Sequence, residues 1–199
     1  SSKNINKVID ILDAYAKDSK VICVVSAVGG ITDKLLLAGQ QAQAKDNSFK
    51  DTLKGIKDTH FSIIKELNPD NNTAILAYAE DKLNALNSLM DGIFLINEIS
   101  PKTSDKLVSF GELLSSFIIA ETMKNRGLLA KRKNSQELIV TNSNFTKAEV
   151  NYGITNKNIQ DYFKSASQQI TILPGFVSKS VVGEQTTLGR GGSDFTAAI

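Results

Sequence analysis

The segment "KVICVVSAVGGITDKLLLAGQQAQA", residues 20–44, decides which fold class the sequence predicts. Its first part, "KVICVVSAV" (20–28), is short, rich in β-branched residues and almost wholly apolar, which is typical of a strand buried on both faces in a parallel sheet. "GGITD" interrupts this run, and helical spacing of apolar residues follows. A strand, a glycine turn and a helix in this order form the first half of a βαβ unit. We therefore expect an α/β protein.

Helices predominate in the rest of the chain. Apolar residues at helical spacing predict helices, and short β-branched runs predict strands. Ser104 is the expected N-cap of the helix at about 105–126, and Pro174 is expected at the end of the last long strand or at a bulge. The expected helices are 3–18, 50–67, 73–99, about 105–126 and 156–168, and the expected strands are 20–28, 128–133, 137–142 and 170–180, followed by a hairpin turn near Gly183. Many helices around a few apolar strands indicate a layered α/β domain.

The composition narrows the function classes. The chain is 41% hydrophobic and 22% charged, as in ordinary globular proteins, and its 23 Lys and Arg residues are scattered, whereas a nucleic-acid site needs them on one face. One cysteine, Cys23, excludes an internal disulfide and a cysteine-rich zinc site, and the single histidine, His60, has no ligand cluster around it. No apolar run approaches the ~20 residues of a membrane span, and no signal peptide opens the chain. We expect no metal site built from protein ligands, no nucleic-acid or membrane partner, and a cytoplasmic location.

The segment "TTLGRGGSDFTAAI" (186–199) combines an open backbone with two fixed charges. Glycines let a backbone approach an anion closely, and Arg190 can bind a carboxylate or a phosphate through two parallel hydrogen bonds. Asp194 suits a place beside a cation near phosphates. The alternative is a plain glycine-rich turn before a helix capped by Ser193. The glycines of this candidate anion loop are Gly189, Gly191 and Gly192.

A second candidate loop, "SAVGGITD" (26–33), follows the first predicted strand. Ligands of open α/β sheets bind beyond the carboxyl ends of the strands. Ser26, Gly29, Gly30 and Thr32 would then line a crevice with hydroxyl and N–H groups. The alternative is an ordinary connection in which Thr32 caps the next helix.

The third candidate is the helical segment "LVSFGELLSS" (107–116). At 100° per residue, Ser109, Glu112 and Ser116 fall opposite the apolar stripe. Gly111 is unusual, since a glycine inside a helix costs about 0.5–1 kcal/mol relative to alanine, and close approach of another backbone or of a ligand would explain it. Glu112 could then bind an ammonium group. The alternative is a solvated helix face.

Together the three segments supply an arginine for a carboxylate, a glutamate for an ammonium group and two glycine loops for anions. An amino-acid substrate with a phosphate-bearing partner matches all three. At these residues the sequence resembles the aspartate kinase family of the amino-acid-kinase fold. The matching stretches are "VVSAVGGITDKLL", "SDKLVSFGELLSS", "ILPGFVS" and "TTLGRGGSDFTAA". "SPKTSD" and the helical segment at 50–99 look more like the form that is fused to homoserine dehydrogenase.

The resemblance implies a three-layer α/β/α sandwich with a mainly parallel central sheet. It also implies transfer of a phosphoryl group from ATP, with Mg²⁺, to the side-chain carboxylate of L-aspartate, on the route to lysine, methionine and threonine. Arg190 would bind a carboxylate of aspartate and Glu112 its ammonium group, with Ser26, Thr32 and Ser193 positioning the substrate. Asp194 would be catalytic, orienting the catalytic lysine and the phosphate end of the site. Enzymes of this family often dimerise, so a homodimer of the full-length enzyme is expected.

The resemblance also implies that residues 1–199 are the N-terminal lobe of an amino-acid-kinase domain, truncated at both ends. The family's first strand, with its K-F-G-G-T-S loop and catalytic lysine, has no counterpart in this sequence, nor has the nucleotide-binding C-terminal half. We therefore expect no turnover by these residues alone. Two alternatives stay open: a kinase of the same fold acting on glutamate, acetylglutamate or a nucleotide, and a non-catalytic ligand-binding module.

Overall fold

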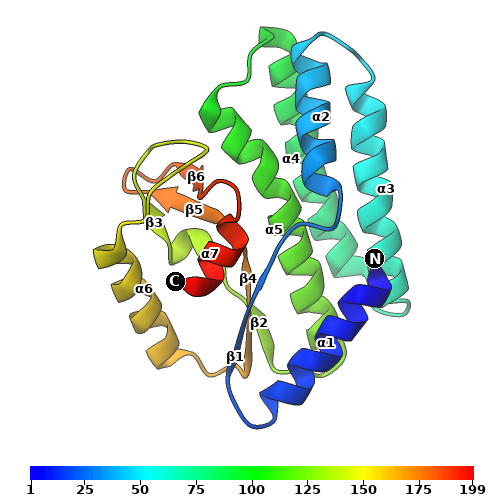
Figure 1. Cartoon of the computed structure of the whole chain (residues 1–199). Coiled ribbons are helices and arrows are strands. Elements are labelled where there is room, and N and C mark those ends of the chain that lie inside the picture. The colour runs from blue at the N-terminus through cyan, green and yellow to red at the C-terminus, as the bar shows by residue number, and fades with distance from the viewer.

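The computed structural model describes all residues, 1–199, as helices on both sides of short strands. Figure 1 shows the helix α5 running along the boundary between the long helices α2, α3 and α4 and the strands. The helices are α1 (Ser2–Ala16), α2 (Ile31–Gln43), α3 (Phe49–Leu67), α4 (Thr73–Ile96), α5 (Pro101–Asn125), α6 (Tyr152–Ser165) and α7 (Gly192–Ala198), with a 3-10 turn at Ser135–Glu137. The strands are β1 (Val21–Val25), β2 (Ala130–Arg132), β3 (Val140–Thr141), β4 (Ile170–Pro174), β5 (Val177–Ser180) and β6 (Gln185–Thr187). None of the helices combines the length and the apolar character that a membrane crossing requires.

The first sheet is parallel, with the strand order β1-β4-β2. All five residues of the central strand β4 are buried, which confirms the second of the two expected buried strands. The expectation of full burial for the strand after residue 20 is wrong, because β1 lies at an edge of this sheet and Ile22 is 52% exposed. The helices α6 and α7 cover the Ile22 face incompletely and leave an apolar cavity of about 180 Å³ there.

The second sheet has the order β3-β5-β6, in which β3 and β5 are parallel and β5 and β6 form an antiparallel hairpin. Gly183 lies in the hairpin turn with φ at 88°, as the sequence predicted, and Pro174 ends β4. Between the two sheets the chain passes through Gly175 and Phe176, whose φ of 44° is in the left-handed region. Because of this kink, residues 170–180 form two strands, β4 in the first sheet and β5 in the second.

Alternate residues of the first sheet face different helices, as the pleat of a strand requires. Ile170 and Ile172 pack with Leu12 of α1 and Ile119 of α5, whereas Leu173 on the opposite face belongs to a cluster with side chains of α6. Helices therefore cover both faces of this sheet. The predicted three-layer α/β/α arrangement with mainly parallel strands is confirmed, although the strands divide into two small sheets.

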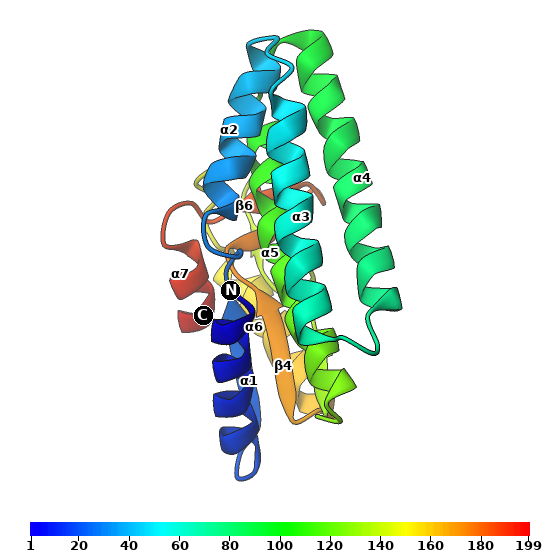
Figure 2. The same ribbon diagram turned by 90° about the vertical axis from the view of Figure 1, so that its right-hand side faces the viewer.

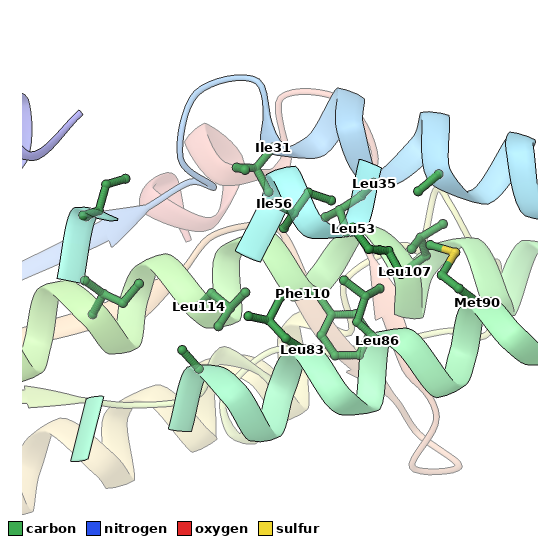
Figure 3. Packing of buried hydrophobic residues seen from close by; sticks show 14 of the residues in the cluster. Ile31, Leu35, Leu53, Ile56, Leu83, Leu86, Met90, Leu107, Phe110 and Leu114 are labelled. Atoms are coloured by element: carbon green, nitrogen blue, oxygen red, sulfur yellow. The ribbon is translucent and has the colours of Figure 1, made fainter. Parts of the chain in front are cut away.

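The largest hydrophobic core does not contain the sheet. Twenty buried residues from α2, α3, α4 and α5 form it, and Figure 2 shows these long helices packed side by side. In Figure 3, Leu35, Leu53, Leu86, Leu107 and Phe110 point toward one another from the four helices. The expectation of helices arranged around strands therefore describes only part of the molecule, because amphipathic helices of this length bury one another.

The helix α5 begins earlier than the sequence suggested. Ser100, rather than Ser104, is its N-cap: the Ser100 hydroxyl accepts a hydrogen bond from the Thr103 N–H at 3.1 Å, and Pro101 occupies the first helical position. Proline suits that position because its missing N–H would have no helical partner there. The extra turn places Asp105 in the second turn of the helix instead of at its first position.

Candidate active site

A cavity of about 510 Å³ lies where the loops that follow β1 and β6 approach one side of α5. Its walls are mostly polar. The lining residues are Ser26, Thr32, Leu36, Ser104, Asp105, Val108, Glu112, Thr146, Phe176, Thr187, Gly189, Arg190, Gly191, Gly192, Ser193 and Asp194.

The structure brings the three predicted segments to this one cavity. Each segment contributes side chains or glycines that the sequence had singled out, although about 70 residues of chain separate each segment from the next. The predicted residues that line the cavity are Ser26, Thr32, Glu112, Gly189, Arg190, Gly191, Gly192, Ser193 and Asp194. Gly29 and Gly30 do not line it: Gly29 lines a neighbouring cavity of about 440 Å³ beside α1, and Gly30 is the N-cap of α2 with φ at 78°.

The polar side of α5 is buried. Ser109 and Ser116 are fully buried and Glu112 is 3% exposed, so the alternative of a solvated helix face is wrong. The physical reason is that α5 packs against the long helices on one side and against the sheet and the loop after β1 on the other. Sequence periodicity alone cannot distinguish a solvated polar face from a polar face that another segment covers.

Close packing between α5 and the loop after β1 explains the glycine inside the helix. A Cβ atom on Gly111 would lie 2.7 Å from the Cβ of Ala27, and one turn further on the Ser115 hydroxyl donates to the Ser26 carbonyl at 2.7 Å. The expected close approach at Gly111 is therefore confirmed, and a protein segment makes it. These contacts hold Ser26 beside Glu112.

Glu112 is a buried carboxylate without a full set of partners. Its Oε2 atom has no hydrogen-bond partner within the chain, and Glu112 faces the cavity. Burial raises the pKa of Glu112 to about 7, and hydrogen bonding from the Ala27 backbone opposes part of this rise. A buried, incompletely paired carboxylate is costly, so this arrangement favours a cationic ligand.

Arg190 and Asp194 lie on the other wall, where both are exposed. None of the seven salt bridges involves either of them. The flanking glycines, Gly189 and Gly191, have φ angles of 77° and 71°, a conformation that other residues adopt only with strain. Gly191 rather than Ser193 is the N-cap of α7, so Ser193 is a residue of the first helical turn.

The kink between β4 and β5 fixes the position of the glycine-rich loop. A Cβ atom on Gly192 would lie 2.5 Å from the Cβ of Phe176, and one on Gly175 would overlap the Ser193 side chain. The Phe176 N–H also donates to the Thr196 hydroxyl at 3.0 Å. Two glycines therefore allow α7 to sit directly against the sheet kink.

The cavity thus presents a buried carboxylate on one wall and a free guanidinium on another, with hydroxyl groups between them. The model of the amino acid kinase family matches residues 1–199. The chain belongs to this family.

The curated relatives of this amino acid kinase family member include aspartokinases and their bifunctional forms. Aspartokinase 1, chloroplastic, from Arabidopsis thaliana is 36% identical over 205 residues, covering 99% of this chain and 35% of the relative. Bifunctional aspartokinase/homoserine dehydrogenase 1, chloroplastic, from the same plant is 28% identical over 202 residues, covering 98% of this chain and 22% of the relative. The chain therefore spans well under half the length of these relatives.

Solved structures of an aspartokinase also match this chain. Aspartokinase III from E. coli in complex with aspartate and ADP (R-state) matches with a TM-score of 0.88 and 27% identity, covering 100% of this chain and 43% of that one. The same enzyme in complex with lysine and aspartate (T-state) matches with a TM-score of 0.86 and 28% identity, covering 98% and 42%. The resemblance to aspartate kinases that the motifs indicated is confirmed.

Sequence reasoning missed several residues of the cavity. Asp105, Thr146, Phe176 and Thr187 line it, but none of them had been singled out as a site residue. Thr187 lies in the candidate segment 186–199 and Asp105 in a predicted helix. Thr146 and Phe176 have left-handed backbone conformations, which no local sequence pattern predicts. The residue types offered one signal only, an aspartate seven positions before Glu112 on the same side of a helix.

Proposed function

We propose that this chain forms the L-aspartate-binding part of an aspartokinase, which transfers a phosphoryl group from ATP to the side-chain carboxylate of L-aspartate. One observation carries the proposal: the buried Glu112, with an unpartnered oxygen, and the free Arg190 line the same cavity. An amino acid in solution carries one ammonium group and at least one carboxylate, which are the partners that these two side chains lack. The aspartate bound to E. coli aspartokinase III supports the choice of amino acid.

Each residue has a role in this proposal. Arg190 binds a carboxylate of aspartate through two parallel hydrogen bonds, and Glu112 accepts hydrogen bonds from the ammonium group. Three hydroxyl groups orient the substrate between them. They belong to Ser26, Thr32 and Ser193. Holding the attacking carboxylate in line with the phosphorus atom supplies most of what such a reaction needs from a protein.

ATP and Mg²⁺ belong to the proposal as well, and the ADP in the E. coli structure supports nucleotide use. The glycine-rich loop offers N–H groups at the cavity, and Asp194 orients the positive group that faces the phosphates. No cluster of three or more His, Cys, Asp or Glu side chains in the chain could hold a metal ion by itself. Mg²⁺ would accordingly take most of its ligands from ATP and water, and it would neutralise charge on the transferring phosphoryl group.

The chain spans 35% and 22% of two aspartokinase relatives, so the activity is proposed for the full-length protein. We propose residues 1–199 as the N-terminal lobe of its kinase domain, inactive without the remainder. The homodimer and the cytoplasmic location stay predictions, as does fusion to a homoserine dehydrogenase. Of the other two hypotheses, a glutamate-type kinase requires space for one more methylene, and a binding module requires no reaction at all.

The test is acceptor-dependent ADP release by the full-length protein. We expect ADP release with L-aspartate, and trapping of the acyl phosphate by hydroxylamine as aspartyl hydroxamate, at rates far above those with L-glutamate or without an acceptor. Release with L-glutamate alone would retain the fold and overturn the substrate. Binding of aspartate without ADP release under any condition would favour the non-catalytic module.

Aspartate binding should depend on pH through Glu112. Its pKa of about 7 means that Glu112 is increasingly protonated below pH 7, while the ammonium group of the ligand requires the ionised form. We expect the dissociation constant for L-aspartate, measured by calorimetry on the full-length protein, to be level above about pH 7.5. Below about pH 6.5 the dissociation constant should increase by nearly tenfold for each unit by which the pH falls, because Glu112 must release one proton when the ligand binds. The Glu112→Gln variant should bind weakly and with a flat profile, and a wild-type profile that is equally flat would contradict this role.

A further inference from the structure

We propose that Asp105 is a positioning residue of the aspartate site: its carboxylate ties the loop 142–150 and the end of β6 to α5, and so holds Arg190 at the cavity. Its kinetic consequence rests on the function proposed above, whereas the contacts do not depend on that function. Asp105 lies in the second turn of α5 and is 1% exposed.

Three donors surround the Asp105 carboxylate. The Thr187 hydroxyl donates to Oδ1 at 2.6 Å and the Thr187 N–H donates to Oδ2 at 3.1 Å. The Thr146 N–H is shared between the two oxygens, at 3.0 Å from Oδ1 and 2.9 Å from Oδ2. Burial raises the pKa of Asp105, and the hydrogen bonds from Thr187 and Thr146 oppose that rise. Both oxygens of the Asp105 carboxylate therefore already accept hydrogen bonds from the protein itself, so Asp105 is poorly placed to bind substrate directly.

The two segments held by Asp105 also contact each other. The Ala148 N–H donates to the Thr187 carbonyl at 3.0 Å. A Cβ atom on Gly189 would lie 3.0 Å from the Thr146 carbonyl oxygen, so the loop 142–150 lies directly against the glycine-rich loop. Thr146 has φ at 70°, an uncommon conformation for a threonine, which the surrounding contacts must maintain.

This arrangement joins Arg190 to α5. Thr187 is three residues before Arg190, and the Arg190 side chain itself forms no salt bridge within the chain that would hold it. Its position therefore depends on where its backbone is anchored. Asp105 is the only charged side chain among the residues that bond to Thr187.

One helix then sets the geometry of both recognition points. Asp105 and Glu112 are seven residues apart, which places them about 10 Å apart along α5 and on the same side of it. Glu112 faces the cavity directly, and Asp105 fixes the loop that brings Arg190 to the opposite wall. The spacing between the ammonium site and the carboxylate site follows from this shared support.

The test is Asp105→Asn in the full-length protein, alone and combined with Arg190→Ala, with Asp58→Asn on the exposed surface of α3 as the control for loss of charge. An amide retains the shape but has one acceptor oxygen in place of two. We expect the KM for L-aspartate to rise tenfold or more with a smaller change in kcat, and Asp58→Asn to change neither. In the Arg190→Ala background, Asp105→Asn should add less than twofold, because the residue acts through Arg190.

Hydrogen exchange provides a readout that does not require activity. In Asp105→Asn, amide exchange should accelerate in residues 142–150 and 187–191 and stay unchanged in α2. Thr187→Val, which removes only the hydroxyl donor, should show the same pattern in weaker form and serves if Asp105→Asn does not fold. Additive effects on KM, or exchange that rises equally in α2, would overturn the positioning role. Absence of aspartate-dependent turnover in the wild type would overturn the proposed function instead, and the exchange pattern would still decide the role of Asp105.

Discussion

Arg190→Ala in the full-length protein is expected to raise the KM for L-aspartate by about a hundredfold or more. The substitution removes two charge-assisted hydrogen bonds, each worth about 1.5–3 kcal/mol, and a factor of ten corresponds to about 1.4 kcal/mol. Stability should change little, because Arg190 is exposed and forms no salt bridge within the chain. Steady-state kinetics and thermal unfolding measure the two quantities.

Glu112→Gln is the matched variant on the other wall, and it should weaken the use of L-aspartate while it stabilises the fold. The KM should again rise by tenfold or more, since the ammonium group loses its anionic partner. Stability should increase at pH 8: a folded-state pKa raised from 4.5 to about 7 means that ionised Glu112 opposes folding, fully so above pH 7 and not at all below about pH 4.5. A KM unchanged by either variant would remove both residues from the site.

Gly192→Ala is expected to lower both stability and activity sharply. The added Cβ atom would lie 2.5 Å from the Cβ of Phe176 and 3.3 Å from its Cα, so backbone must move. Such overpacking costs about 1–3 kcal/mol, and the segment that moves carries Arg190 and Asp194. The unfolding midpoint of the chain should fall by several degrees, and kcat/KM of the full-length protein should fall by at least a hundredfold.

Gly92→Ala provides the control for this prediction. Gly92 lies inside α4, and no atom lies within 4 Å of the position that its Cβ would take. Alanine there should stabilise the helix by up to about 1 kcal/mol and leave the kinetics unchanged. If Gly192→Ala behaved like Gly92→Ala, the close packing between α7 and the sheet kink would not hold.

Much of the fold and several residues of the candidate site could be predicted from the sequence, because the sequence patterns that indicate them are local. Hydrophobic spacing identified the helices, and the β-branched run after Lys20 identified the first βα connection. Arg190 and Glu112 were recognisable because each stands in an unusual setting, one among glycines and the other beside a glycine inside a helix. The geometry then brought both to one cavity, and their roles remain proposals.

The parts that escaped prediction depend on tertiary contacts. Asp105 has its acceptors filled by residues 41 and 82 positions away along the chain, which no local pattern shows. The polar side of α5 has the periodicity of a solvated face and is buried because the sheet and the loop after β1 cover it. Likewise the edge position of β1 depends on which strands become its neighbours, which the composition of the strand does not determine.

The most direct test of the account is a crystal structure of the full-length protein with bound L-aspartate. We predict electron density for the amino acid in the cavity between α5 and the glycine-rich loop. Its ammonium group should lie within hydrogen-bond distance of Glu112, and a carboxylate should pair with the Arg190 guanidinium. Aspartate bound elsewhere in the protein, with Glu112 and Arg190 free of ligand at saturating concentration, would contradict the central claim.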